Sequence, residues 1–353
     1  MSENGEERES GDGRQRINVG IDLGTSRSAI STSGGEKRLI ESYVGWPVDM
    51  VARKVLKRDM LVGKEALDNR LMLDLHRPLE RGLIKEGSEK DAEAVRQLFI
   101  ALLRLAGIEE SDGERFKVRA VVGVPASAMR VNKQQLRDAL TGVVDSLMIV
   151  SEPFAVAYGL DALLHALIID IGAGTTDFCV MNGRYPTDDD QRTLTKAGDS
   201  VDQLLFQAIS EHHPEAKLSE HMVREWKEQH GFVGEPPDGP VKVVAPVNGK
   251  PTEFDITQEL KLACESLLPP LIEAMHDLIS KVEPEYQAAV RGNVILSGGS
   301  SLVRGMGRAF HDALEEVGGG KVRVVKDPIY VGSDGGLAIA NDAPDSDWEK
   351  IAT

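Results

Sequence analysis

Two copies of one short pattern restrict the possible folds of this chain more than any other feature. In each copy an apolar segment ends at an aspartate, Asp22 or Asp170, and a turn rich in small residues separates it from a second short apolar segment. Aligning Asp22 with Asp170 also places Gly24 on Gly172. Each copy predicts a β-hairpin, and matched hairpins far apart in a chain indicate two related halves. We therefore expect a duplicated, two-lobed protein.

The rest of the chain predicts mixed α/β structure. Its 353 residues exceed the usual size of one domain. Hydrophobic residues make up 41% of the sequence and aromatic residues only 5%, so the core is expected to be mainly aliphatic, as in α/β proteins. Hydrophobic periodicity predicts helices over 65–73, 90–106, 129–140 and 201–211, one long helix over 257–282, and strands over 43–48, 60–62, 116–124 and 294–297.

Composition also excludes several classes of protein. The formal net charge of -16 disfavours binding to nucleic acid. Cys179 and Cys264 form no disulfide framework and are expected to be buried as small hydrophobic side chains. The polar segment 1–16 resembles neither a signal peptide nor an amphipathic anchor, and is expected to be a disordered tail. Without a long apolar run, the prediction is a cytoplasmic protein with no direct membrane insertion.

The two hairpin turns have the composition of phosphate-binding turns. Small residues allow backbone N–H groups to approach a phosphate closely. The turn residues are Gly24, Thr25 and Ser26 in the first copy, and Gly172, Gly174, Thr175 and Thr176 in the second. Asp22 and Asp170 would repel a bare triphosphate, which predicts Mg²⁺ between carboxylate and phosphate. One such hairpin alone would be an ordinary turn capped by aspartate, but the matched pair favours phosphate binding, and the sequence has no P-loop.

Two further positions are candidates for chemistry. Glu152 begins a helix of small residues just before the second hairpin, where a carboxylate can orient and deprotonate a water that attacks a γ-phosphate. The alternative is a helix N-terminal acid that interacts with the helix dipole. Gly298 and Gly299 follow a strand and can leave room for a base or ribose, although such pairs are often only turn geometry.

Other polar residues are expected to lie on the surface. His212 and His213 lack ligands at metal spacing. The charged stretches 85–93 and 224–229 are predicted to be solvated helix faces, although Lys227 can reach an adenosine.

The order of these motifs resembles that of the actin superfamily, which also contains sugar kinases and the heat-shock chaperone ATPase. The resemblance covers nearly the whole folded chain. In chain order the segments are the first phosphate motif (21–25), the first connecting helix (152–159), the second phosphate motif (170–177), the segment that follows it (197–202), the adenosine motif (296–302) and the second connecting helix (332–338).

The resemblance implies an actin-like, ribonuclease H-like duplicated α/β fold with two lobes and four subdomains, and ATP or ADP with Mg²⁺ as cofactors. Asp22 and Asp170 would hold the metal, and Glu152 and Asp170 would be catalytic. The implied nucleotide contacts add four residues to the turns and the Gly298–Gly299 pair: Gly198, Asp199, Lys227 and Ser300. One departure is Arg224, which stands where the related adenine segment usually carries an acid.

The resemblance also implies domain boundaries. The tail 1–16 precedes a first lobe core of 17–47, 90–160 and 336–353, with a small insertion at 48–89. The second lobe core comprises 161–200 and 262–335, with an insertion at 201–261.

Among actins, the chain is most similar to the bacterial branch that forms magnetosome filaments, with the rod-shape proteins as the nearest relatives. This implies an ATPase that assembles head to tail with copies of itself, disassembles after hydrolysis, and positions magnetosome organelles through adaptor proteins. Three alternatives remain: a cell-shape actin, a sugar- or acetate-kinase-type phosphotransferase, and a nucleotide-dependent adaptor that does not polymerise.

Overall fold

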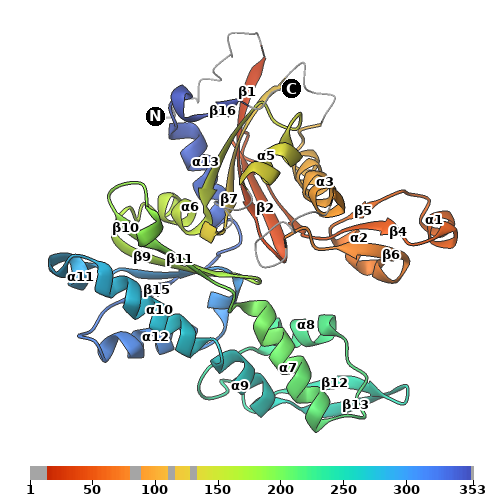
Figure 1. The fold of residues 1–353 in the computed structure, drawn as a ribbon. Coiled ribbons are helices and arrows are strands. Elements are labelled where there is room, and N and C mark those ends of the chain that lie inside the picture. Colours follow the sequence, from red (N-terminus) through yellow and green to blue (C-terminus); the bar gives the residue numbers. More distant parts are fainter. Residues whose placement is uncertain (1–13, 80–88, 110–115, 128–132, 351–353) are drawn as a thin grey trace, which may run out of the picture. The chain divides into compact units, whose positions relative to one another are not determined.

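In the computed structural model the chain divides into two compact units, each built around its own sheet (Figure 1). The structure describes residues 14–79, 89–109, 116–127 and 133–350. The first unit comprises residues 1–162 and 327–353, and the second comprises 163–326. The chain thus returns to the first unit at residue 327, ahead of the predicted 336, and the finer subdomain boundaries stay a prediction. Of the tail predicted for 1–16, residues 1–13 lie outside the described residues.

The first unit contains a six-stranded sheet and a small three-stranded sheet. The six strands, in spatial order, are β3 (Lys37–Glu41), β2 (Arg27–Thr32), β1 (Gln15–Leu23), β7 (Phe116–Val124), β8 (Ser146–Ser151) and β16 (Glu349–Lys350). The three strands are β5 (Leu61–Val62), β4 (Val44–Pro47) and β6 (Leu73–His76).

The sheet of the second unit repeats the order of the first. Its strands are β11 (Gln191–Leu194), β10 (Thr176–Asn182), β9 (Leu164–Ile171), β14 (Val294–Ser297) and β15 (Val322–Val324). In each sheet the first strand of an antiparallel hairpin pairs in parallel with a later strand. Strand β1 of the hairpin β1–β2 pairs with β7, and strand β9 of the hairpin β9–β10 pairs with β14. A separate hairpin joins β12 (Lys242–Val247) and β13 (Lys250–Asp255).

Both units contain helices beside their strands. In the first unit they are α1 (Met50–Leu56), α2 (Lys64–Asp68), α3 (Glu89–Leu105), α5 (Lys133–Leu140), α6 (Glu152–Gly159), α13 (Val331–Asp342) and 3₁₀ turns at Arg70–Met72 and Asp345–Asp347. In the second unit they are α7 (Gly198–His212), α8 (Glu220–His230), α9 (Thr257–Glu265), α10 (Leu268–Lys281), α11 (Pro284–Arg291), α12 (Met306–Glu315) and 3₁₀ turns at Asp188–Asp190 and Gly299–Leu302. Among the described residues, no helix is both long and apolar enough to cross a membrane.

Strand β1 shows how the sheet of the first unit is covered on both faces. Val19, Ile21 and Leu23 share a core with α3 residues such as Leu98, as the two-residue period of a strand requires. Gly20 points the other way, and a Cβ there would lie 2.1 Å from the backbone N of Leu337 in α13. Glycine is therefore required at position 20, because the α13 backbone packs directly on the strand.

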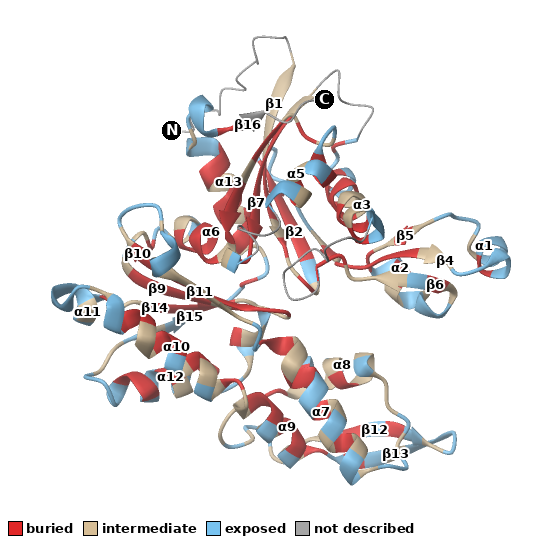
Figure 2. Cartoon of the chain, in the orientation of Figure 1, coloured by how far each residue is buried: buried red, intermediate tan, exposed pale blue. Residues whose placement is uncertain are grey.

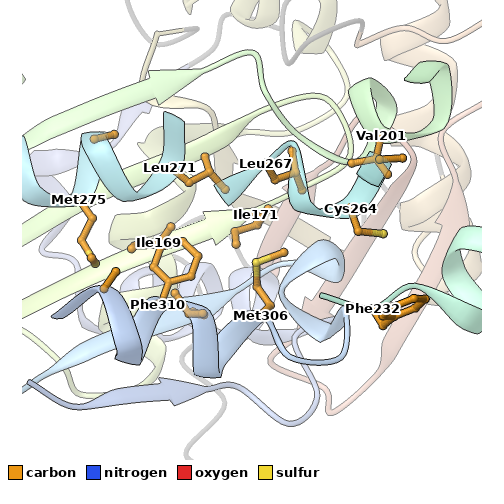
Figure 3. Packing of buried hydrophobic residues seen from close by; sticks show 14 of the residues in the cluster. Ile169, Ile171, Val201, Phe232, Cys264, Leu267, Leu271, Met275, Met306 and Phe310 are labelled. Carbon is orange, nitrogen blue, oxygen red and sulfur yellow. The ribbon is translucent and has the colours of Figure 1, made fainter. Parts of the chain in front are cut away.

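The core of the second unit is larger and also aliphatic in the main. Ile169 and Ile171 of β9 pack with Leu271 and Met275 of α10 and with Phe310 of α12 (Figure 3). Red ribbon in Figure 2 follows the central strands and the inner faces of these helices. Cys179 and Cys264 are both free and buried, as predicted.

The structure confirms both hairpins and corrects three predictions. The helix predicted over 65–73 ends at Asp68, and a 3₁₀ turn and strand β6 follow it. The long helix predicted over 257–282 is two helices, α9 and α10, because Pro269 and Pro270 lack the amide hydrogens that a continuous helix needs. The stretch 224–229 is not a solvated face throughout, since Lys227 is buried. His212, by contrast, is exposed at the surface as predicted, with its ring against Glu259.

Candidate functional site

The two hairpin turns have the same length and register. In the first, Asp22 pairs with Ala29, and in the second Asp170 pairs with Asp177, so each aspartate faces the residue seven positions further along. The tip residues are Thr25 and Ser26 in one turn and Ala173 and Gly174 in the other. Within the described part of the chain, the amides of these four residues donate to no acceptor. Paired backbone N–H groups of this kind form a concave anion site.

The carbonyl groups of the first turn are held by donors from the same unit. Ser42 donates its hydroxyl to the carbonyl oxygen of Gly24 at 2.7 Å and its amide to that of Ser26 at 2.9 Å. Gly24 itself has no room for a side chain, since a Cβ there would lie 2.4 Å from the carbonyl oxygen of Arg27. These bonds fix the peptide planes of the turn and so fix the direction of its amides.

Asp22 lies at the end of β1, beside the start of helix α13. A Cβ at Gly332 would lie 2.7 Å from the Asp22 Oδ2 atom, so a glycine is needed where the helix approaches this carboxylate. Burial raises the pKa of Asp22 from its ordinary 3.8 to about 6. A carboxylate kept from water in this way is stabilised in its charged form by a nearby cation.

Glu152 lies at the same edge of the sheet as Asp22. It is the first residue of α6, directly after β8. Gly123 separates the two acids: it pairs with Asp22 across β1 and β7, and a Cβ there would lie 3.6 Å from the Glu152 Cγ atom. Two predicted acidic residues therefore lie at one end of the sheet, with Gly123 between them.

In the second unit the phosphate turn is bonded to the start of helix α7. The amide of Gly198 donates to the carbonyl oxygen of Gly172 at 3.1 Å, and the amide of Asp199 donates to that of Ala173 at 2.7 Å. The Ser300 hydroxyl also donates to the Gly172 oxygen, at 2.9 Å. With its carbonyl groups held on this side, the turn leaves its tip amides available.

The Gly298–Gly299 segment meets the acidic end of β9. Gly298 has φ of +79°, and a Cβ there would lie 2.4 Å from the Asp170 Oδ1 atom. Around Gly299, by contrast, a Cβ would meet nothing within 4 Å. The backbone thus packs tightly against Asp170 and is open one residue later; a base or ribose in this position stays a prediction.

Helix α8 carries two cations that contact the first turn of α7. The Lys227 Nζ atom donates to the carbonyl oxygen of Gly198 at 2.9 Å and lies 2.6 Å from the Asp202 Oδ1 atom. Arg224 bonds Asp199 at 2.9 Å and Asp202 at 3.0 Å. The predicted residues Gly198, Asp199 and Lys227 therefore lie together with Gly172 and Ser300.

Thr176 is turned away from the tip of its turn. It is fully buried, and its hydroxyl donates to the carbonyl oxygen of Lys196 at 2.7 Å. Its side chain therefore serves the strand rather than the turn. Thr175 is also buried.

Comparison with known proteins decides the family. The MreB/Mbl protein family matches residues 16–346. The chain belongs to this family. The predicted actin-like fold is thereby confirmed, in agreement with the duplicated sheets.

Within the MreB/Mbl family, the chain is similar to proteins named MamK. It is 40% identical over 341 residues to the actin-like protein MamK of Paramagnetospirillum magneticum, a match that covers 97% of both chains. The MamK of Magnetospirillum gryphiswaldense is 41% identical over 97% of this chain and 93% of that protein. The cell shape-determining protein MreB of Pasteurella multocida is 25% identical over 308 residues. The predicted order of resemblance, MamK first and MreB more distant, is confirmed.

Solved structures of MamK agree with this relationship. A MamK double helical filament matches with a TM-score of 0.89 and 41% identity, over 93% of this chain and 100% of that one. A non-polymerising MamK mutant bound to AMPPNP matches with a TM-score of 0.71 and 41% identity, over 93% of this chain and 99% of that one. Relatives of this MreB/Mbl chain thus include a filament and a nucleotide complex.

Several residues support the site in ways that were not predicted from the sequence, although Gly332, Asp202 and Arg224 lie in or beside the predicted segments. Gly123 and Gly332 surround the two acids of the first unit, and Arg224 and Asp202 hold the start of α7. A glycine inside the valine-rich strand Phe116–Val124 was a usable signal, because glycine in a strand often marks a close approach. No sequence signal pairs Arg224 with Asp199, since that contact depends on how two helices cross.

Proposed function

We propose that this protein binds and hydrolyses ATP and assembles with copies of itself into cytoplasmic filaments. One observation carries the proposal: each unit presents the same aspartate-led turn, with two tip amides that donate to no acceptor among the described residues. Such turns suit the oxygens of a polyphosphate. Membership of the MreB/Mbl family and the AMPPNP complex of a MamK mutant support ATP as the ligand.

The donor set also suits a magnesium ion. Mg²⁺ keeps several waters and binds through one or two carboxylates together with phosphate oxygens. Asp22 and Asp170, each at the end of the first strand of a hairpin, are the proposed ligands. No group of three or more His, Cys, Asp or Glu side chains arranged to hold a metal occurs among the described residues. When bound, the ion would neutralise phosphate charge.

Glu152 is the proposed base for hydrolysis. Glu152 begins α6, beside Gly123 and at the same end of the sheet as Asp22. A carboxylate there can orient a water and accept its proton. Phosphoryl transfer needs mainly such positioning, because little covalent chemistry is left for the protein.

Filament assembly is the proposed use of the ATPase. Head-to-tail contacts that do not close into a ring produce an open filament, and MamK forms a double helical filament. ATP would favour the assembling conformation, and hydrolysis would weaken it. By the same similarity we propose that the filaments position magnetosomes, connected to them through adaptor proteins.

Sedimentation tests the proposal directly. Purified protein is centrifuged at high speed after incubation with Mg-ATP, Mg-AMPPNP, Mg-ADP or ATP with EDTA. We expect most of the protein in the pellet with Mg-ATP or Mg-AMPPNP, and little of it with Mg-ADP or with ATP and EDTA. Soluble protein in all four, together with phosphate transfer to a sugar or to acetate, would instead favour a phosphotransferase.

A further inference from the structure

The ion pairs between helices α7 and α8 are not explained by nucleotide contact alone. They involve Arg224 and Lys227 of α8, and Asp199 and Asp202 of α7. Two cations and two carboxylates balance in charge. The side chains of Asp202 and Lys227 are only 8% and 10% exposed, so the group is largely shielded from water.

Every member of this group acts on the first turn of α7. Arg224 bonds the Asp199 carboxylate, and Lys227 donates to the carbonyl oxygen of Gly198. The amides of Gly198 and Asp199 in turn donate to the carbonyl oxygens of Gly172 and Ala173 in the phosphate turn. A continuous series of bonds therefore runs from the Arg224 guanidinium, through the start of α7, to the tip of the turn.

We propose that Arg224 is a positioning residue for the second phosphate turn. It holds the first turn of α7 through Asp199 and Asp202, and α7 holds the carbonyl groups of the turn so that the amides of Ala173 and Gly174 stay available to phosphate. A planar guanidinium presents a rigid fork of donors that can bond two carboxylates at once, whereas a lysine presents a compact charge on a flexible stem. This role rests on the proposed function, because it assumes that the turn binds a nucleotide.

The proposal differs from a role in binding the nucleoside. If residue 224 contacted the base or ribose, its loss would weaken the binding of ATP and of adenosine equally. If it positions the phosphate turn, its loss weakens the binding of ATP and leaves that of adenosine almost unchanged. An Arg224→Glu variant sharpens the contrast, since an acid at 224 suits a hydroxyl of the ribose but repels Asp199 and Asp202 in this chain.

The experiment compares Arg224→Met, Arg224→Lys and Arg224→Glu with the wild type. Calorimetry measures the dissociation constants of Mg-ATP and of adenosine. We expect Arg224→Met to weaken Mg-ATP binding about tenfold or more, because hydrogen bonds from the turn amides to charged phosphate have effects of this size, and to change adenosine binding less than twofold. The dissociation constant of Mg-ATP for Arg224→Lys should lie between those of the wild type and Arg224→Met. Arg224→Glu should weaken Mg-ATP binding most.

Hydrogen exchange gives a second readout that needs no nucleotide. In the nucleotide-free protein, Arg224→Met should speed exchange at the amides of Gly198 and Asp199, with no change in α10. Asp199→Asn, which removes one partner of Arg224, should do the same, and it carries the test if Arg224→Met does not fold. Arg308→Met is the matched control, because its side chain is 86% exposed and 3.6 Å from Asp312 on the same helix.

The outcomes separate this inference from the proposed function. If the wild type binds no Mg-ATP, the proposed function fails, whatever the exchange data show. If the wild type binds Mg-ATP but Arg224→Met weakens ATP and adenosine equally, or leaves exchange at Gly198 and Asp199 unchanged, the positioning role of Arg224 is wrong.

Discussion

The hydroxyl of Ser300 donates a hydrogen bond of 2.9 Å to the carbonyl oxygen of Gly172, a residue 128 positions earlier in the chain. This bond joins the predicted adenosine segment directly to the second phosphate turn. Gly172 accepts from the Gly198 amide as well, so three segments of the second unit meet at one carbonyl group. Changes in any of them should therefore affect the same turn.

Gly298→Ala should lower both stability and ATP binding. Its φ of +79° disfavours any residue with a Cβ, and that Cβ would also lie 2.4 Å from the Asp170 Oδ1 atom. We expect a loss of about 1 kcal/mol from the backbone and a further 1–3 kcal/mol from the clash, measured by urea unfolding. Gly249→Ala is the control: its φ is +78° but nothing lies within 4 Å, so it should show the backbone cost alone. Equal losses in the two variants would contradict this account.

Glu152→Gln should slow ATP hydrolysis without weakening ATP binding. The amide keeps the size of the side chain but cannot accept a proton from water. General base catalysis of this kind contributes about 10²–10⁴-fold, and a fall in that range is expected in a phosphate-release assay, with filaments that persist longer. The exposed Glu316 provides the control variant Glu316→Gln. Normal turnover by Glu152→Gln would exclude Glu152 as the base.

Asp22→Asn should change how stability depends on pH. Burial raises the pKa of Asp22 from 3.8 to about 6, so the native state binds this proton more tightly than the unfolded state does. The stabilisation is present below about pH 4 and is lost as pH rises through 6, a change of up to about 3 kcal/mol. The variant, which cannot ionise, should therefore gain stability relative to the wild type between pH 4 and pH 7.

This comparison uses nucleotide-free protein in EDTA, with urea unfolding at several pH values. Asp312→Asn, at an exposed ion pair, is the control and should show little pH-dependent difference. A stability difference between wild type and Asp22→Asn that is the same at pH 4 and pH 7 would show that burial does not raise the pKa of Asp22.

Both thiols should be unreactive in the folded protein. Burial raises the pKa of the Cys264 thiol to about 11 and that of Cys179 further, and the thiolate is the reactive form. At pH 8 a disulfide reagent such as DTNB should label neither residue in native protein and both in guanidinium chloride. Rapid labelling of native protein would mean that the second unit, which contains both cysteines, opens readily around one of them.

Local sequence predicted much of this fold, because the signals are local. Strands Phe116–Val124 and Val294–Ser297 have the predicted bounds, since an apolar run between turns specifies a buried strand. The periodic segment 90–106 is helix Glu89–Leu105. The prediction of one continuous helix was wrong at Pro269 and Pro270. Hydrophobic periodicity continues across these residues, but they lack the amide hydrogens that a continuous helix needs.

The sequence by itself determined the two aspartate-led turns, their matched spacing and the glycines that allow close backbone approach, because each depends on neighbours within a few residues. Only the tertiary structure decided which distant groups support them. Gly332 lies against Asp22, Ser300 reaches Gly172, and Arg224 reaches Asp199. These pairings depend on how helices pack on sheets, and the many side-chain contacts that set that packing are not encoded in any short segment.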